Sequence, residues 1–191
     1  MSEHIVGVNP KVYNGRKYKS TLEAETAKTL DDLGIPWEYE AITYTLQEGF
    51  YCPWQKRKVE DIQYTPDFRI GPIIVETKGY ETPDWKIKKK LFFKHLKETA
   101  PDTLYYIVKN TRQLLEILDQ YWPAFDIQVA VSTRGTKKIP SETKVYNSIK
   151  DAMIELQLTG RPMGSILRSL LGKAMWIYGY NWKLIKVQNG N

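Results

Sequence analysis

Two apolar segments separated only by Gly71-Pro72 constrain the fold of this chain more than any other feature of its sequence. The segments cover 62–70 and 73–78, and both are rich in the β-branched and aromatic residues that favour strands. Because the connection is only two residues long, the segments are expected to form an antiparallel hairpin. In that hairpin Ile70 pairs with Ile73, and this pairing determines the register of all the other residues.

The predicted register places Asp67 directly opposite Glu76, with their Cβ atoms about 4.5–5.5 Å apart. Lys78 leaves the same face of the strand as Glu76, roughly 7 Å along it. Two opposed like charges destabilise a sheet unless a cation lies between them, and Lys78 supplies one positive charge. A divalent ion would supply more, and hard oxygen ligands favour magnesium or manganese. We interpret the hairpin as a metal-dependent centre, because the apolar residues on both strands disfavour the alternative, a solvated ion cluster.

Pro66-Asp67, followed by a hairpin and by Glu76-Thr77-Lys78, resembles the PD-(D/E)xK nuclease signature. Over about 20–108 the chain also resembles the phage junction-resolving endonuclease I family. The segments that carry this resemblance are 20–23, 34–40, 64–68 and 75–79. The resemblance implies an α/β fold with a restriction-endonuclease-like core, in which helices flank a mixed central sheet.

The resemblance also implies phosphodiester hydrolysis with Mg²⁺ as the cofactor, for which Mn²⁺ can substitute, and products with 5′-phosphate and 3′-hydroxyl ends. The residues implied in catalysis are Glu23, Asp67, Glu76 and Lys78. Those implied in metal binding are Glu23, Asp67 and Glu76, with the carbonyl of Thr77 as a further ligand. Lys78 would position or activate the attacking water.

Glu23 has a second interpretation. The spacing from Ser20 to Glu23 is that of an S-x-x-E capping box, at the start of an expected helix that ends before Gly34. A glutamate that caps its own helix is not free to bind a metal ion, so the two roles exclude each other. On the strength of the resemblance we favour the catalytic role.

The other elements of the first domain follow from caps and periodicity. Thr82, as N-cap, and Pro83, at the first helical position, predict a helix that runs to about Thr99. The further elements expected are strands at 37–46, 103–108 and 127–131, a helix at 111–121, and a long hairpin tip or loop at 47–61.

The composition divides the chain into a basic N-terminal arm at 1–19, a nuclease domain at 20–131, a polar linker at 132–144 and a small α-helical module at 145–191. In this module Ser148 is the expected N-cap of one helix, and a second helix is expected to start at Arg161 or Pro162. The pattern resembles the helix-turn-helix DNA-binding segments of phage and intron homing endonucleases. The alternative is a helical pair that packs on the nuclease core.

The formal net charge is +6, and residues 145–191 carry most of it. A basic module of this kind favours a polyanionic partner. The residues expected to contact DNA are Lys17, Lys19, Lys86, Lys89, Ser148, Ser165, Arg168, Ser169 and Lys173. The alternative for the lysines is an ordinary solvated face.

Cys52 is the single cysteine and His4 and His95 are the only histidines, so an internal disulfide and a zinc site with several Cys and His ligands are excluded. No apolar run is long enough to cross a bilayer, and no secretion signal is recognised. We therefore expect no membrane partner and a cytoplasmic location. The resemblance implies that this is the cytoplasm of a phage-infected bacterial cell.

These features together predict a site-specific endonuclease of the homing type, acting on double-stranded or branched DNA. One alternative is a structure-selective Holliday-junction-resolving endonuclease with the same chemistry. The other is a non-catalytic DNA-binding protein. We expect a homodimer with exchanged elements, because one centre cuts one strand and two-fold symmetry supplies the second centre.

Overall fold

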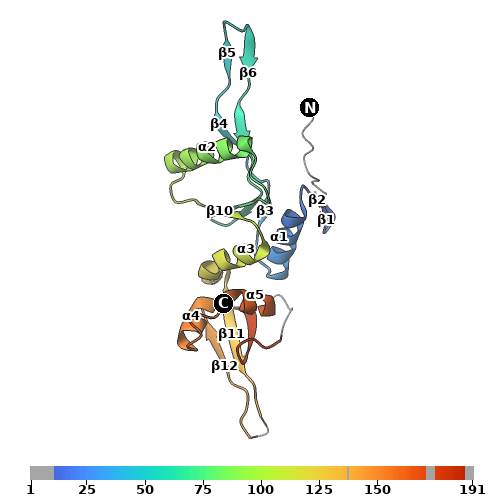
Figure 1. Cartoon of the computed structure of the whole chain (residues 1–191), viewed down its shortest axis with the longest axis vertical. Helices are drawn as coiled ribbons and strands as arrows, with labels where there is room; N and C mark the ends of the chain where they lie inside the picture. Colours follow the sequence, from blue (N-terminus) through green and yellow to red (C-terminus); the bar gives the residue numbers. More distant parts are fainter. Residues whose placement is uncertain (1–10, 137, 171–174, 188–191) are drawn as a thin grey trace. The chain divides into compact units, whose positions relative to one another are not determined.

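The computed structural model describes residues 11–136, 138–170 and 175–187. The chain divides into two compact units, Met1–Thr111 and Arg112–Asn191. Helices and small sheets alternate along the chain (Figure 1), so the expected α/β class is confirmed at this level. In the part of the chain that the structure describes, no helix is long and apolar enough to cross a membrane.

A four-stranded sheet is the centre of the first unit. Its order is β10 (Leu104–Val108), β9 (Ile73–Thr77), β8 (Phe68–Ile70) and β3 (Glu38–Tyr39). β9 is antiparallel to β8 and parallel to β10, so the sheet is mixed, as expected. The parallel pair needs a crossover, which helix α2 (Pro83–Thr99) supplies.

The strand expected at 62–70 is divided in two. β7 (Ile62–Tyr64) pairs with β4 (Tyr44–Gln47), whereas β8 pairs with β9. Pro66 lies between β7 and β8, and since proline has no N–H it cannot continue a hydrogen-bonded ladder. The strand expected at 37–46 is divided in the same way, at Glu40, where φ is +48°.

Helix α1 (Thr21–Asp32) begins where the sequence predicts, because the Oγ of Ser20 accepts a hydrogen bond from the Glu23 N–H at 3.2 Å. No strand was expected in the arm at 1–19, but its second half contains two. There β1 (Lys11–Tyr13) and β2 (Arg16–Tyr18) form a hairpin against α1.

The turn of this N-terminal hairpin explains the difference. Asn14 and Gly15 have φ of 48° and 76°, and Asn-Gly is the sequence most favoured where both turn residues need positive φ. Tyr18 is buried, and its ring packs on that of Tyr39 with centroids 4.9 Å apart. Residues 1–10 lie outside the described part.

Helix α2 starts as predicted, with the Thr82 Oγ1 accepting a hydrogen bond from the Trp85 N–H at 3.2 Å. On this helix Ile87 is exposed, while Trp85, Phe92 and Leu96 are buried. These three side chains pack with Tyr64 and neighbouring residues into a core cluster. The helix is therefore rotated so that its tryptophan, and not Ile87, faces the sheet.

The segment at 47–61 forms the hairpin tip that was expected. β5 (Phe50–Cys52) pairs with β6 (Arg57–Val59), and this pair continues the β4–β7 ribbon away from α2 (Figure 1).

The second unit differs from the expected α-helical module. Its helices are α3 (Thr111–Leu118), the 3₁₀ helix η1 (Asp119–Phe125), α4 (Ile149–Glu155) and α5 (Met163–Leu170). The first residue of α3 still belongs to the first unit. The second unit also contains an antiparallel sheet of order β12 (Thr143–Tyr146), β11 (Ile127–Thr133) and β13 (Tyr180–Lys186).

The expected domain boundary at 131/132 falls within β11. This strand is the centre of the second sheet, with Val129 paired to both Tyr146 and Leu184, so it cannot belong to the first domain. The expected linker at 132–144 contains the end of β11 and the start of β12. The strand β13 supplies the partner that makes β11 a central strand, although the two strands lie far apart in the sequence.

Asp119 connects the helices of the second unit. It is buried, and its Oδ1 accepts hydrogen bonds from the Ile149 N–H at 2.7 Å and from the Trp122 Nε1–H at 2.9 Å. Its Oδ2 accepts one from the Lys150 N–H at 3.2 Å. The carboxylate therefore binds the amino end of α4, where the helix dipole stabilises negative charge.

Replacing Phe92 with Ala is expected to lower the free energy of unfolding of the first unit by about 3–5 kcal/mol. Phe92 is fully buried, and its ring lies 4.8 Å from that of Tyr64 and 5.0 Å from that of Tyr105. Urea unfolding followed by circular dichroism measures the change. The matched control is Phe93→Ala on the exposed side of α2, and equal losses in the two variants would contradict this packing.

Candidate active site

The central hairpin has the predicted register. Ile70 pairs with Ile73 and Phe68 with Val75, and Gly71 adopts a φ of 56°, which favours glycine. Asp67 immediately precedes β8 and Glu76 lies near the end of β9, one step beyond the paired residues. The hairpin thus brings the two carboxylates to the same end of the sheet.

Asp67 is held by the last residue of β9. Its Oδ2 accepts two hydrogen bonds from Thr77, one from the backbone N–H at 2.7 Å and one from Oγ1–H at 2.6 Å. The residue is 8% exposed, and its Oδ1 has no hydrogen-bond donor among the described residues. One oxygen is therefore fixed by the fold, while the other keeps its acceptor capacity.

Glu76 is held in a similar way by α2. Its Oε1 accepts a hydrogen bond from Trp85 Nε1–H at 3.0 Å and lies 3.4 Å from Lys78 Nζ. Glu76 is 4% exposed, and its buried Oε2 has no hydrogen-bond partner in the described structure. A buried carboxylate oxygen without a partner costs at least roughly 1–3 kcal/mol, so this atom marks a place where a cation would be stabilising.

The two carboxylates resist ionising together. The pKa of Asp67 is raised to about 7, mainly by burial and also by the charges of Glu76 and Glu23, while the hydrogen bonds from Thr77 oppose the increase. Burial also raises the pKa of Glu76, opposed by the nearby Tyr64, Lys78 and Trp85. A positive charge bound beside the pair would favour both ionised forms.

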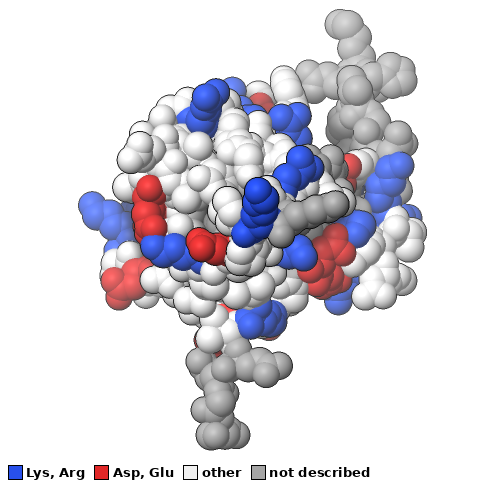
Figure 2. All heavy atoms as spheres, turned by 90° about the horizontal axis from the view of Figure 1, so that it is seen from below, with Lys and Arg blue, Asp and Glu red and all other residues white. Residues whose placement is uncertain are grey.

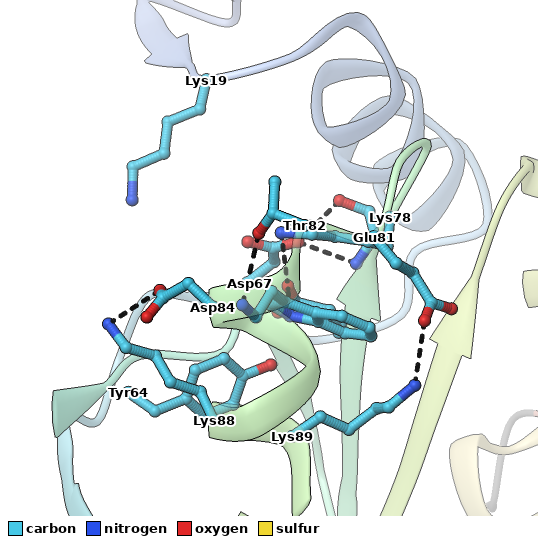
Figure 3. A network of polar contacts seen from close by, with 12 residues as sticks. Lys19, Tyr64, Asp67, Lys78, Glu81, Thr82, Asp84, Lys88 and Lys89 are labelled. Carbon is cyan, nitrogen blue, oxygen red and sulfur yellow. Dashed lines mark hydrogen bonds and ion pairs between the residues drawn. The ribbon is translucent and has the colours of Figure 1, made fainter. Parts of the chain in front are cut away.

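Two lysines lie against the ring of Trp85. Lys78 Nζ is 5.1 Å and Lys89 Nζ is 4.5 Å from the ring centroid, within the range of cation–π interactions. Lys89 also forms an ion pair with Glu81 at 3.1 Å (Figure 3). Lys89 was expected to contact DNA, but here its side chain is half-buried and engaged within the protein.

Glu23 is buried at the start of α1. Its Oε2 accepts hydrogen bonds from the Lys19 N–H at 2.9 Å and from the Tyr39 hydroxyl at 2.6 Å. The full capping box, which would use the N–H of Ser20, is therefore not formed. The charge of Glu23 raises the pKa of Asp67, so the residue belongs to the same electrostatic environment.

The carboxylates do not form a three-ligand cluster. Among the residues that the structure describes, no three Asp, Glu, His or Cys side chains are grouped closely enough to hold one ion. The structure thus offers Asp67 and Glu76 as a pair, with Glu23 engaged by Tyr39. Three of the four expected catalytic residues, Asp67, Glu76 and Lys78, are brought together.

Three aromatic residues of the site were not predicted from the sequence. Trp85 holds Glu76, and the hydroxyls of Tyr64 and Tyr105 share a hydrogen bond of 2.7 Å beside it. Trp85 could have been predicted, because it lies three positions after the expected N-cap Thr82. It is therefore in the first turn of the helix that follows Glu76-Thr77-Lys78. Tyr105 has no local signal, since only the pairing of β10 with β9 places it there.

The other lysines of the first unit that were expected to bind DNA lie at its surface. Lys17 and Lys86 are exposed. Lys19 forms an ion pair with Glu40, although its side chain remains largely exposed.

In the second unit the expected DNA contacts fall into two groups. Ser148 is buried and caps α4, its Oγ accepting a hydrogen bond from the Asp151 N–H at 2.9 Å, and Ser169 is buried as well. Arg168 is exposed and donates a hydrogen bond from its guanidinium to Ser165 Oγ at 3.2 Å. Lys173 lies outside the described residues. On the face shown in Figure 2, basic and acidic side chains are interspersed.

Comparisons of the chain with family models, with curated proteins and with solved structures found no match. The function is therefore inferred from the residues and contacts of this chain.

Replacing Asp67 with Asn is expected to make stability less sensitive to pH. Because the pKa of Asp67 is about 7 in the folded protein, the folded state retains a proton that the unfolded state has lost. This contribution to the free energy of unfolding therefore falls as pH rises from about 4 to 7, by at most about 1.4 kcal/mol per pH unit. Above pH 7 it stays constant.

Denaturant unfolding in EDTA between pH 5 and 8 tests this expectation. The Asp67→Asn variant should gain stability relative to the wild type up to about pH 7. In a parallel series with Mg²⁺ in place of EDTA, the ion should stabilise only the wild type. A constant difference across this range would contradict the raised pKa.

Proposed function

We propose that this protein is a metal-dependent endonuclease that cuts double-stranded DNA at specific sites, in the manner of homing endonucleases. The observation that carries the proposal is the buried pair of Asp67 and Glu76, in which Glu76 Oε2 has no hydrogen-bond partner in the described structure. Buried carboxylate oxygens with a purely structural role are in most cases hydrogen-bonded. A pair with unused oxygens and raised pKa values is typical of a functional site.

The donor atoms suit magnesium or manganese. Asp67 Oδ1, Glu76 Oε2 and the carbonyl of Thr77 are hard oxygen ligands. Magnesium is commonly bound through one or two carboxylates, with waters and substrate phosphate completing its shell, so a pair of carboxylates is sufficient. When bound, such an ion stabilises the charge of the phosphodiester and lowers the pKa of water.

The chain's own residues would prepare the centre. Thr77 fixes Asp67 through one oxygen, and Trp85 fixes Glu76 through one oxygen, so that the other oxygen of each remains available. Lys78 Nζ, 3.4 Å from Glu76 Oε1, would hold the attacking water or the phosphate. The expected products carry 5′-phosphate and 3′-hydroxyl ends.

Glu23 is proposed as a ligand of a second ion. Its side chain would then have to give up its hydrogen bond with Tyr39. Such a change is local, because the N-cap of α1 depends on Ser20 and not on the Glu23 carboxylate.

The second unit supports the site-specific form of the proposal. A junction resolvase needs little beyond the catalytic core, whereas this chain adds a unit with two short helices, α4 and α5, of which α5 carries the exposed Arg168. The alternatives are a structure-selective Holliday-junction resolvase and a non-catalytic DNA-binding protein. We propose a homodimer as the working form, since a double-strand break needs two centres.

Replacing Glu76 with Gln, or Lys78 with Ala, is expected to lower the rate of DNA cleavage at least about 100-fold while DNA binding in Ca²⁺ changes little. Phosphate contacts elsewhere carry affinity, whereas these two side chains act at the scissile bond. Cleavage of linear duplex, nicked duplex and four-way junctions in Mg²⁺ is measured on gels. The control is Glu98→Gln on the exposed face of α2, and undiminished cleavage in excess EDTA would exclude the metal mechanism.

Replacing Trp85 with Phe is expected to lower kcat about tenfold with little change in KM. The phenyl ring keeps much of the packing but cannot donate to Glu76 Oε1, so the carboxylate loses its orientation. Single-turnover cleavage measures the effect, and thermal unfolding checks that the variant is folded. A loss of stability with unchanged kcat would show that Trp85 serves packing alone.

A further inference from the structure

A two-stranded ribbon extends from the candidate active site. β4 and β7 form its root, and β5 and β6 its outer part (Figure 1). The two parts meet at Gly49, whose N–H donates to Asp61 Oδ1 at 2.8 Å. A Cβ at this position would lie 2.5 Å from the carbonyl oxygen of Val59, so the close approach of the strands requires glycine.

The root of the ribbon packs at the carboxylate pair. The rings of Tyr44 and Tyr64 lie 4.9 Å and 4.8 Å from that of Phe92. The Tyr64 hydroxyl shares a hydrogen bond with that of Tyr105, and burial together with the charge of Glu76 raises the pKa of Tyr64. The ribbon is therefore anchored beside the residues proposed to cut DNA.

The outer part of the ribbon exposes three aromatic rings within five residues. Phe50 is 53%, Tyr51 62% and Trp54 81% exposed. Trp54 lies in the turn, where the Lys56 N–H donates to the Pro53 carbonyl at 3.3 Å. Large apolar groups gathered in this way mark a surface that meets a partner.

Cations are interleaved with these rings. Lys56, Arg57 and Lys58 follow the turn directly, and the register places Lys58 beside Tyr51. Lys58 forms an ion pair with Glu60 at 3.0 Å, whereas Lys56 and Arg57 have no carboxylate at ion-pair distance in the described part of the chain. The tip therefore offers unneutralised positive charge together with aromatic surface.

This combination matches nucleic acid, in which bases alternate with phosphates. A two-stranded ribbon fits the major groove of DNA, and exposed aromatic rings stack on bases whose own stacking is disturbed. A second copy of the same tip would bring like charges together, and an apolar protein partner would not require the cations.

We infer that the β5–β6 hairpin inserts into the DNA beside the cleavage centre, with Trp54 stacking on an unpaired or unstacked base while Lys56 and Arg57 contact phosphates. The inference rests on the proposed function, because it assigns the hairpin to the DNA that Asp67 and Glu76 would cut. It adds a requirement for distorted DNA at the site, supplied by a kinked step, a nick or a branch.

Binding of fluorescein-labelled DNA to the full chain in Ca²⁺ tests the inference. The probes are an intact duplex, a nicked duplex and a four-way junction. Trp54→Ala should raise Kd about tenfold on the nicked and branched probes, and Trp54→Phe should restore binding because it keeps a ring. Lys56→Ala/Arg57→Ala should reduce the slope of log K against log salt by about 2. Lys28→Ala, a charge change on α1, is the control.

The outcomes separate the two proposals. If the wild type cuts DNA in Mg²⁺ and the hairpin variants bind and cut as well as the wild type does, the hairpin inference alone is overturned. A wild type that never cuts, but whose binding still depends on Trp54 and Arg57, would overturn the nuclease and leave the hairpin as a DNA contact. Loss of a dimer in Trp54→Ala by sedimentation, with unchanged DNA binding, would identify a second copy as the occupant and overturn the inference. Thermal unfolding verifies that each variant is folded.

Discussion

The burial of Asp67 and Glu76 at one end of the same sheet is the constraint on which the rest of the site depends. Two carboxylates removed from water repel each other and each loses hydration, so the fold must supply donors. It does so for one oxygen of each residue, through Thr77 for Asp67 and through Trp85 and Lys78 for Glu76. Because the compensation is incomplete, the site retains a demand for positive charge.

Helix α2 supplies part of the compensation for the buried carboxylates. Its N-cap Thr82 holds the first turn so that Trp85 Nε1 reaches Glu76, and the same ring is bordered by the ammonium groups of Lys78 and Lys89. The helix that provides the crossover between β9 and β10 therefore also orients a site carboxylate. A change that rotated α2 to bury Ile87 would disrupt the packing and the site together.

The two contacts with DNA that we propose differ in their physics. The second unit presents Arg168 on a short helix beside a small sheet, an arrangement suited to contacts with intact duplex. The β5–β6 hairpin presents Trp54 with cations, which is suited to a base that has left its stack. A site-specific nuclease would use both features, whereas a resolvase would depend mainly on the hairpin.

Sequence alone determined the features that depend on neighbouring residues. The two-residue turn at Gly71-Pro72 determined the register, and Ser20 and Thr82 determined where α1 and α2 begin, because turns and caps act within a few residues. The Asn14-Gly15 turn is equally local, because Asn-Gly favours the positive φ of both turn residues. Asp67, Glu76 and Lys78 followed from the register.

Only the tertiary structure decided the features that depend on distant pairing. β11 lies in the second unit because its partner β13 comes from the far end of the chain, and Tyr105 reaches the site because β10 pairs with β9 across the α2 crossover. The engagement of Glu23 by Tyr39 likewise required the packing of α1 near β3. Local propensity cannot specify such contacts, because their free energy arises only when remote segments are buried together.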